Sequence, residues 1–359
     1  MIKKHIIAAV LVAASAMLPF ASVTVEAAPL EWQMASAFGA GPWFDRDAKN
    51  FVERVKLLTE GRLNITPLPS GALGSPLKVT ETVKAGVAAV GFNWQGYDWG
   101  VDRTTVLFAG YSGGMRTPEE YMLWLYEGGG VALWEQFRRE RFGVVSFPCV
   151  SLGTEIFLHS RKKIENLKDF KGLKLRTSGA WAEIATRLGA STVVLPGTEV
   201  YTALERGVID ATEWGSPEIN LPVGFQKVAK YIIVPGIHQA GGFLECEFNV
   251  EAWNKLAPRD QEMIRLAAKQ SVYESWLKAS TADLSAWRNM KKSDNVIVRL
   301  APDFIAKAME VTDQWSKEQA EKNPWFSKVW NNMRSFKKEL ELMPEYRLNI
   351  GQPLDKPGK

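Results

Sequence analysis

Residues 197–214 read GTEVYTALERGVIDATEW. Apolar residues recur at helical spacing up to Gly207, and a glycine in this place commonly ends a helix. The short run that follows has the composition of a buried strand, and it ends at Trp214. This stretch therefore predicts a helix, a tight turn and a strand that enters a sheet.

A similar unit lies earlier in the chain, at 79–94, with the sequence VTETVKAGVAAVGFNW. Both units place apolar residues and a glycine at the same spacing. The matching positions are Val79, Val83, Gly86 and Val87 in the first unit and Val200, Leu204, Gly207 and Val208 in the second. Either two lobes share one topology, or two generic helix–glycine–strand units happen to coincide.

The sequence around these units continues the alternation of strands and helices. Residues 30–36 have strand character, and 61–71 read as a strand followed by a turn. Between them, apolar residues recur at helical spacing from Phe44 to Leu58. Downstream, 172–176 predicts a strand, followed by a helix and a further strand. This alternation favours an α/β fold with two lobes and a cleft between them.

The region after Pro258 is mostly helical in pattern, and a further helix begins near Pro302. A last helix carries one apolar stripe, which we expect to pack on the body of the protein or against a second subunit. The stripe consists of Phe326, Val329, Trp330, Met333, Phe336 and Leu340. We expect these C-terminal helices to brace both lobes, and 351–359 to form a polar tail.

The N-terminus has the pattern of a secretory signal peptide. Lys3 and Lys4 precede a short apolar run, and Val25 and Ala27 provide small residues for cleavage. A transmembrane anchor is the alternative, but serines and a proline interrupt the run. We therefore predict that 1–27 is removed and that the mature protein is periplasmic.

The overall composition excludes some partners and sites. The 44 basic and 40 acidic side chains produce no field that would attract nucleic acid. After removal of the signal peptide only His159 and His238 remain as histidines, which excludes a histidine-rich zinc site. Cys149 and Cys246 are the only cysteines, and either a bridge or two buried thiols fits their apolar surroundings.

No catalytic motif stands out in the sequence. It contains no P-loop, GxGxxG, HExxH, CxxC or GxSxG pattern. A secreted lyase or hydrolase that uses Glu155 and Glu213 as acid and base is the enzyme alternative. We predict a binding protein and no enzyme.

Arg176 is the one charged residue in a suggestive place. It ends the predicted strand in KDFKGLKLRTSG, immediately before a turn and a helix. Ligands of open α/β sheets bind beyond the carboxyl ends of strands, so an arginine here can hold a carboxylate through two N–H···O bonds. The alternative is a strand-end arginine that pairs with an acid such as Asp169.

Three segments resemble TRAP-transporter solute-binding proteins, the DctP-like family. They are DFKGLKLR, LERGVIDATEW and PGIHQAGG, and the resemblance extends from 61 to about 258. It is closest to the branch that binds 2-oxo and 2-hydroxy acids, often with a metal ion. The resemblance implies a two-lobed periplasmic-binding-protein-like fold that delivers a small organic anion to integral membrane TRAP transporter subunits.

The resemblance also assigns roles to individual residues. Arg176 corresponds to the arginine that clamps the ligand carboxylate. Glu213 and Trp214 match a pair that contacts the ion through the glutamate side chain and the tryptophan backbone. Glu155 falls at another ligand position, and Gln239 stands where the branch has a glutamate. This departure weakens a hard-cation site, but Glu155 stands where the branch usually has an amide, and its carboxylate could restore the lost charge. Bound sodium or calcium is therefore an expectation, and no cofactor is required.

The same resemblance suggests the walls of the cleft. Asn93, Trp94 and Tyr97 correspond to an aromatic segment on one side, and Phe38 to a loop position that often faces the ligand. His238 is a further candidate, although a lone histidine in an apolar run is more often structural. For each of these residues, packing in the core or rim is the alternative.

We expect one lobe to hold 28–150 with a returning segment at about 241–280. The other lobe should hold 151–240 with part of 281–350. The ligand should be a monocarboxylate, with an aromatic carboxylate or a small sulfonate as alternatives. An ABC importer would be the alternative partner, and a homodimer through the last helix is a further hypothesis.

Overall fold

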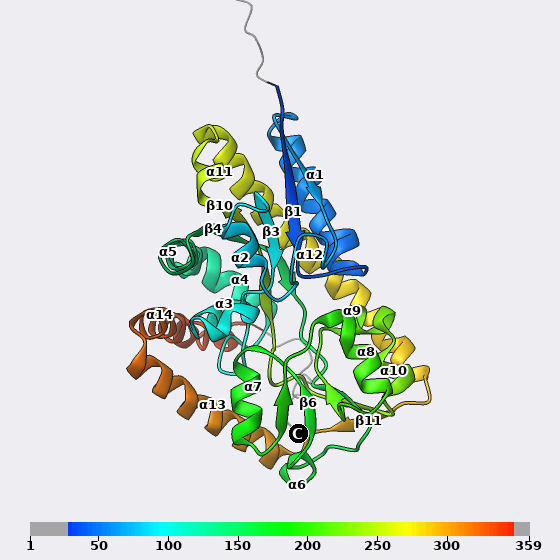
Figure 1. The fold of residues 1–359 in the computed structure, drawn as a ribbon. Helices are drawn as coiled ribbons and strands as arrows, with labels where there is room; N and C mark the ends of the chain where they lie inside the picture. Colours follow the sequence, from blue (N-terminus) through cyan, green and yellow to red (C-terminus); the bar gives the residue numbers. More distant parts are fainter. Residues whose placement is uncertain (1–27, 348–359) are drawn as a thin grey trace, which may run out of the picture.

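The computed structural model describes residues 28–347, in which two β-sheets stand one above the other (Figure 1). The predicted signal peptide, 1–27, and the predicted polar tail, 351–359, lie outside the described residues. We call the five-stranded sheet with its helices the first lobe, and the six-stranded sheet with its helices the second lobe. The predicted α/β class and the two-lobed arrangement are confirmed.

The first lobe has a mixed sheet in the order β2-β1-β3-β10-β4. Its strands are β1 (Leu30–Ser36), β2 (Leu63–Pro67), β3 (Val90–Asn93), β4 (Val144–Leu152) and β10 (Gly242–Asn249). Its helical segments are η1 (Trp43–Ala48), α1 (Lys49–Leu58), α2 (Val79–Lys84), η2 (Gln95–Gly100), α3 (Thr105–Ala109), α4 (Pro118–Glu127), α5 (Gly130–Phe142) and α11 (Val250–Asn254). β1 pairs in parallel with β2 and β3, and β10 runs antiparallel to β3 and β4.

The second lobe has a sheet in the order β11-β9-β5-β8-β6-β7. Its strands are β5 (Leu158–Ser160), β6 (Lys174–Arg176), β7 (Ser191–Val193), β8 (Ala211–Thr212), β9 (Tyr231–Val234) and β11 (Val296–Arg299). Its helices are α6 (Leu167–Phe170), α7 (Gly179–Arg187), α8 (Gly197–Glu205), α9 (Pro217–Val223) and α10 (Phe225–Val228). β6 pairs in parallel with β7 and β8, and β5 runs antiparallel to β8 and β9.

The two sheets repeat one arrangement. Read from the other end, β7-β6-β8-β5-β9 has the same order and the same parallel and antiparallel pairings as β2-β1-β3-β10-β4. α2 and α8, the two helices that the sequence comparison aligned, each connect an edge strand to the middle of its sheet. Gly86 and Gly207 adopt left-handed conformations, with φ of +73° and +72°, which a side chain would disfavour. The predicted common topology is therefore confirmed.

Two short segments of the chain cross between the lobes. Residues 153–157 lead from β4 to β5, and 235–241 lead back from β9 to β10. The long helix α12 (Pro258–Lys292) packs against β4 in the first lobe and against α9 in the second. These connections bring polar side chains of the crossing segments to the junction of the lobes.

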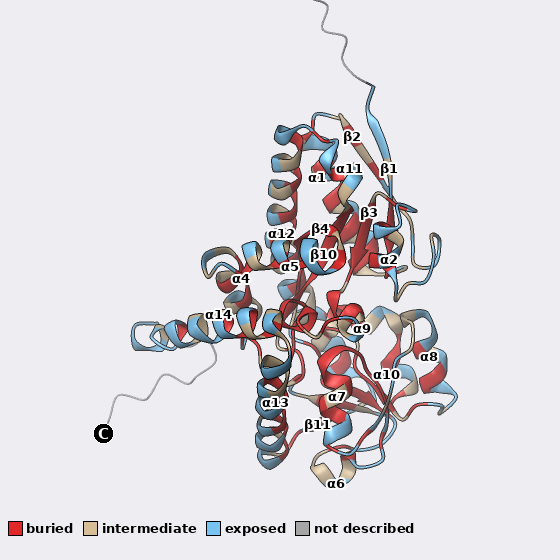
Figure 2. Cartoon of the chain, turned by 60° about the vertical axis from the view of Figure 1, so that its left-hand side comes forward, coloured by how far each residue is buried: buried red, intermediate tan, exposed pale blue. Residues whose placement is uncertain are grey.

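The remaining C-terminal helices brace both lobes. α13 (Pro302–Lys322) packs on α7 of the second lobe, and α14 (Pro324–Leu340) packs on α13 and on α3, α4 and α5 of the first. A short segment, η3 (Met343–Glu345), follows. The apolar stripe of α14 is mostly buried inside the chain (Figure 2). The stripe packs on the body of the protein, so the hypothesis of a dimer through this face loses its basis.

Cys149 in β4 and Cys246 in β10 form a disulfide, with their Cα atoms 5.7 Å apart. Both side chains are fully buried between neighbouring strands. The structure thus decides between the two alternatives that the sequence left open, in favour of a bridge.

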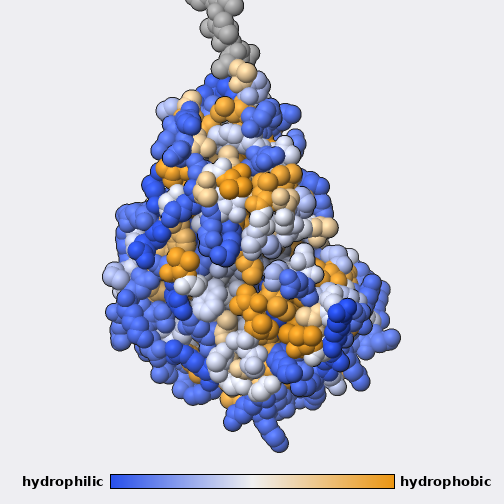
Figure 3. Space-filling model, in the orientation of Figure 1, coloured by the Kyte–Doolittle hydropathy of each residue, from blue (hydrophilic) through white to orange (hydrophobic). Residues whose placement is uncertain are grey.

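The face drawn in Figure 3 is largely hydrophilic, with hydrophobic residues gathered near its centre. Among the described residues, no helix combines the length and the apolar character that crossing a membrane requires.

Candidate ligand-binding site

A small cavity lies where the two lobes meet. Its volume is about 30 Å³, counted as the space that the centre of a water molecule can reach. The first lobe lines it mainly with the aromatic residues Phe38, Trp43, Trp94, Tyr97 and Tyr111. The second lobe contributes Arg176, Ser178, Trp181, Glu213 and Trp214. The crossing segments add Glu155, His238 and Gln239.

Arg176 and Glu213 are brought together by two neighbouring parallel strands. Arg176 is the last residue of β6 and is paired in register with Thr212, the last residue of β8. Glu213 follows β8 directly, so both side chains leave the sheet at its carboxyl edge. This edge is where ligands bind in open α/β sheets.

The guanidinium of Arg176 is only 2% exposed and is held on two sides. Its Nε and Nη2 donate to the carbonyl oxygen of Leu195 at 3.2 and 3.0 Å, and its Nη1 donates to Oε1 of Glu213 at 3.2 Å. The ring of Trp214 lies 5.1 Å from its Cζ. These bonds leave one N–H on each terminal nitrogen of Arg176 for a ligand. Such a pair can hold a carboxylate in bidentate fashion.

The crossing segments place a second polar group in the same cavity, close to Glu213. Nε2 of His238 lies 2.8 Å from Oε2 of Glu155, and Nε2 of Gln239 donates to Oε1 of Glu155 at 2.9 Å. Burial raises the pKa of Glu155, and the hydrogen bond from His238 opposes this rise. The two segments also bond through their backbones, from the N–H of Glu155 to the carbonyl oxygen of Gln239.

Glu155, Glu213 and His238 each offer one atom within 4.8 Å of the others, so two of the predicted metal ligands, Glu155 and Glu213, come close together, with His238 beside them. A calcium ion requires six or more oxygen ligands. Of the four carboxylate oxygens here, both of Glu155 accept hydrogen bonds from the protein, and Oε1 of Glu213 accepts two, from Arg176 and from the N–H of Ser178. Gln239 directs a donor at Glu155. Since each carboxylate oxygen carries two lone pairs, Glu155 and Glu213 could still hold a sodium or calcium ion between the lobes.

Trp94, Tyr97 and Phe38 line the cavity, as the resemblance to the family predicted. The Trp94 and Tyr97 rings meet edge to face at 5.2 Å, and Nε1 of Trp94 donates to the carbonyl oxygen of Ala109 at 3.0 Å. Burial raises the pKa of the Tyr97 hydroxyl, and the charge of Arg176 opposes the rise. The wall is therefore apolar and rigid, with one phenol close to the arginine.

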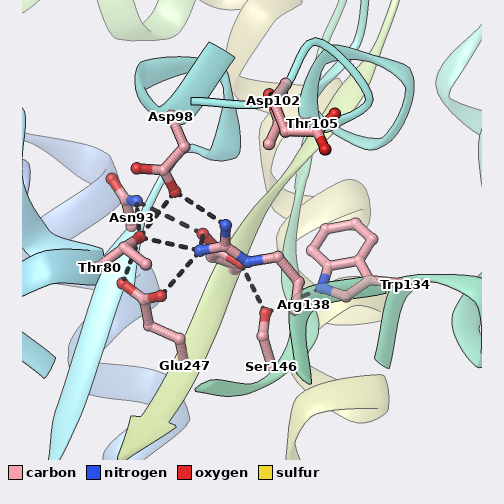
Figure 4. Close-up of polar contacts among 10 residues, drawn as sticks. Thr80, Asn93, Asp98, Asp102, Thr105, Trp134, Arg138, Ser146 and Glu247 are labelled. Carbon is pink, nitrogen blue, oxygen red and sulfur yellow. Dashed lines mark hydrogen bonds and ion pairs between the residues drawn. The ribbon is translucent and has the colours of Figure 1, made fainter. Parts of the chain in front are cut away.

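Asn93 does not line the cavity, so its expected place in the wall is wrong. Side chains alternate along a strand, and that of Asn93 points into a buried polar cluster around Arg138 (Figure 4). Nδ2 of Asn93 donates to Thr80 at 3.2 Å and to Glu245 at 3.4 Å. The residue holds the strand that precedes the wall and contacts no ligand space.

The guanidinium of Arg138 is completely buried among three carboxylates (Figure 4). It donates to Asp98 at 2.9 Å, to Glu245 at 2.7 Å and to Glu247 at 2.9 Å. Burial raises the pKa of Glu245 to about 7, although the charge of Arg138 lowers it, and burial raises the pKa of Glu247 as well. Since Asn93 and Asp98 flank the segment with Trp94 and Tyr97, the cluster fixes both ends of the aromatic wall.

Sequence reasoning missed several residues of the site. Trp43 and Trp181 line the cavity, and Ser178 and Leu195 hold Glu213 and Arg176 through backbone groups. Trp43 follows the glycine-rich turn after β1, and Trp181 begins the helix after Arg176. Both therefore follow the carboxyl end of a strand, which is a signal that could have identified them. Contacts through a backbone carry no such signal.

Comparisons with known proteins agree with this geometry. The DctP family model, described as bacterial extracellular solute-binding protein, family 7, matches residues 39–323. The monocarboxylate 2-oxoacid-binding periplasmic protein of Nostoc sp. is 29% identical over 311 residues, which cover 87% of this chain and 85% of that protein.

Two solved structures are similar throughout. A TRAP periplasmic solute binding protein from Pseudoalteromonas atlantica, with bound sodium and pyruvate, is 28% identical, with a TM-score of 0.84 and coverage of 89% of this chain and 97% of that one. A protein of the same kind from Colwellia psychrerythraea, with bound calcium and pyruvate, is 28% identical, with a TM-score of 0.83 and coverage of 88% and 97%. The family comprises solute receptors and not enzymes. The chain therefore belongs to family 7 of the bacterial extracellular solute-binding proteins, the DctP family.

Proposed function

We propose that this protein is a periplasmic receptor for a small monocarboxylate, a 2-oxo or 2-hydroxy acid, which it delivers to a TRAP-type membrane transporter. The observation that carries the proposal is a buried arginine at the carboxyl edge of a sheet, with N–H groups beside a cavity between the lobes. A ligand carboxylate bound there loses its water shell but gains hydrogen bonds to the fixed positive charge of Arg176. These bonds are strong because the dielectric constant of the buried site is low.

The second polar group gives the proposal its ligand class. Glu155, His238 and Gln239 line the same cavity as Arg176 and can engage an oxygen next to the carboxylate. The remaining walls are aromatic rings, which suit a short carbon chain. The small volume favours an acid of few carbons. Relatives that bind pyruvate support the same class.

Closure of the lobes is part of the proposed mechanism. Both lobes and both crossing segments line the cavity, so a ligand contacts all of them only when the lobes are together. A ligand that binds the closed arrangement better shifts the protein toward it. We propose lobe boundaries at 28–150 with 241–280, and at 151–240 with part of 281–350, and the sheet membership of β10 and β11 supports this division.

The test is a thermal-shift screen of organic acids, followed by titration calorimetry of those that stabilise the protein. Pyruvate, lactate and longer 2-oxo acids should stabilise it, while the matching amides should not. Aromatic carboxylates and small sulfonates form the alternative arm, because the rings of the wall could stack on an aromatic ligand. Failure of every anion to bind would refute the receptor proposal.

Recovery of intact ligand would separate a receptor from the enzyme alternative. The protein is incubated with pyruvate and then denatured, and the released acid is measured by mass spectrometry. Conversion of the acid would favour acid–base chemistry by Glu155 and Glu213. Genes for a small and a large integral membrane subunit beside this one, in place of an ATPase gene, would support the TRAP partner over an ABC importer. A homodimer remains a prediction that light scattering can test.

A further inference from the structure

We infer that two copies of this chain associate through an exposed apolar row on α12, with the two helices antiparallel. We call this row the α12 stripe, and it consists of Leu266, Tyr273, Leu277 and Leu284. None of its residues lines the ligand cavity. Association through the α12 stripe therefore does not depend on which ligand the protein binds.

The α12 stripe places large apolar side chains in solvent along one side of the helix. Leu266 is 47% exposed, Tyr273 57%, Leu277 43% and Leu284 61%. Residues at these spacings of seven, four and seven positions return to the same side of an α-helix, so they form one row about 27 Å long. Single exposed apolar residues are common, but a continuous row of them marks an interaction surface.

The opposite side of α12, which faces the protein, is made mostly of small residues. From 267 to 286, every buried residue of the helix except Val272 is an alanine or a serine. These small side chains let α12 lie against β4 and α9. Figure 2 shows the helix at the outer edge of the first lobe, with an exposed side turned outward. A surface helix normally turns its large apolar residues inward, so the reversed arrangement of α12 indicates a second surface that covers its outer side.

The order of residues in the α12 stripe indicates that this second surface is the same helix of another copy. Leu266 and Leu284 lie nine positions on either side of Ser275. Tyr273 and Leu277 lie two positions on either side of it. A two-fold axis at the level of Ser275 would set α12 antiparallel to its copy. Leu266 would then contact the partner's Leu284, and Tyr273 would contact the partner's Leu277.

The charges at the two ends of the α12 stripe favour the antiparallel arrangement over a parallel one. Glu262 and Arg288 are exposed and lie thirteen positions on either side of Ser275. In an antiparallel pair, Glu262 is level with the partner's Arg288, and this occurs twice in the dimer. In a parallel pair each residue would meet its own copy, and like charges would repel. Arg259 lies farther out, where Glu60 of the same chain offsets its charge at 2.7 Å.

Cross-linking of single-cysteine variants tests the direction of the pairing. Both native cysteines form the buried disulfide, so an introduced cysteine is the only free thiol of the chain. Leu266→Cys and Leu284→Cys are treated with a short bis-maleimide at micromolar concentration, each alone and then mixed. We expect a covalent dimer only in the mixture, because like residues of an antiparallel pair lie about 27 Å apart. Val208→Cys, in an exposed turn of the second lobe, is the control and should not cross-link.

Sedimentation velocity over a range of concentrations tests the strength of the association. Leu277→Glu should weaken self-association by about ten-fold or more, because it places a charge at the centre of the interface. Val208→Glu adds the same charge away from the α12 stripe and should dimerise as wild type does. Glu262→Arg should weaken the dimer, and Arg288→Glu added to it should restore the dimer. Circular dichroism shows that each variant is folded.

Two results would overturn the antiparallel pairing: a covalent dimer from Leu266→Cys alone, or none from the mixture. A wild-type protein that stays monomeric at every concentration would do the same, and would instead fit an α12 stripe reserved for another partner such as the membrane subunits. A folded Leu277→Glu protein that dimerises as strongly as wild type would place the interface elsewhere. None of these measurements requires an organic acid, so failure of the proposed function would leave their outcome unchanged.

Discussion

Arg46 in the first lobe holds Glu218 in the second lobe through two hydrogen bonds of 2.9 Å, one from each terminal nitrogen. Glu218 is nearly buried, and its backbone N–H donates to Asp283 of α12 at 2.8 Å. The pair joins η1 to α9 across the junction of the lobes, beside the wall of the cavity. It can form only when the lobes are together.

We therefore expect Glu218→Gln to favour the open arrangement. The variant should bind ligand more weakly by about 1 kcal/mol, or roughly five-fold, because part of the closing energy is lost. Titration calorimetry measures the affinity, and small-angle scattering of the ligand-free protein measures its dimensions. Lys49→Gln is the control, since Lys49 pairs with Asp45 on the exposed side of the same segment. Equal affinities for all three proteins would show that the pair does not contribute to closure.

Arg176→Ala should cost on the order of 2–5 kcal/mol of binding, because a buried ligand charge would lose its partner. Arg176→Lys should recover only part of this loss, since an ammonium cannot form the same two bonds. Calorimetry with pyruvate gives the affinities. Arg187→Ala, which removes a half-exposed arginine of the same lobe, should change nothing. Unchanged affinity in Arg176→Ala would remove this residue from the site.

The buried Glu245 should make stability fall as the pH rises toward neutrality. Its pKa is raised from 4.5 to about 7 in the folded protein, so between these values the folded state keeps a proton that the unfolded state has released. Its contribution is complete below pH 4.5 and is lost as the pH rises through 7, with a slope of up to about 1.4 kcal/mol per pH unit.

Glu245→Gln should remove this slope, as measured by urea unfolding at a series of pH values. Glu262→Gln, a change at an exposed position, should keep it. If the slope persists in Glu245→Gln, another group of the cluster carries the proton.

His159 should act in the opposite direction, making the protein less stable in acid. It is completely buried, and burial lowers its pKa from 6.5 to about 3. Between these values the unfolded state binds a proton that the folded state does not, so stability is lost as the pH falls below 6.5. His159→Gln keeps a partner for Asn220, which lies 3.2 Å from the ring. This variant should show a flatter loss of melting temperature from pH 6 to pH 4, and an unchanged profile would contradict the assignment.

The bridge between Cys149 and Cys246 joins residues 97 positions apart in the sequence. Replacement of both by alanine should lower the free energy of unfolding by about 2–5 kcal/mol, mainly because the unfolded chain gains freedom. Urea unfolding of the two proteins measures the difference. Reductant added to the folded wild type should act slowly, since both sulfurs are buried. A double variant as stable as wild type would show that sheet packing alone fixes these strands.

Much of the fold follows from local patterns in the sequence. The spacing of apolar residues and the glycines at 86 and 207 predicted two similar units, and the common strand order of the sheets confirms them. The place of Arg176 at the end of a strand could also be inferred, because strand ends share one edge of a sheet. The alternative partner of Arg176, Asp169, was wrong. The carboxylate of Asp169 instead caps α6 by accepting from the backbone N–H of Asn166, so it does not pair with Arg176.

The rest depends on contacts between distant segments, which one sequence does not display. Asn93 lies one position before a wall residue, and only the direction of its strand assigns it to the Arg138 cluster. The pairing of Arg46 with Glu218 joins residues 172 positions apart. Whether the apolar stripe of α14 packs on the protein itself or on a second subunit depends on which helices cover it. The pattern of the stripe alone does not specify those helices.

Two sheets of one design allow a division of labour between their matching edges. The edge that bears Arg176 and Glu213 in the second lobe corresponds to the edge that bears Phe38 and Trp94 in the first. The second lobe thus selects the ligand by its charge, while the first lobe covers it with an apolar aromatic wall that excludes solvent. Replacing Phe38 or Trp94 by a smaller or larger residue should therefore change which carbon chains bind. The preference for an acid should not change, because it depends on Arg176 in the second lobe.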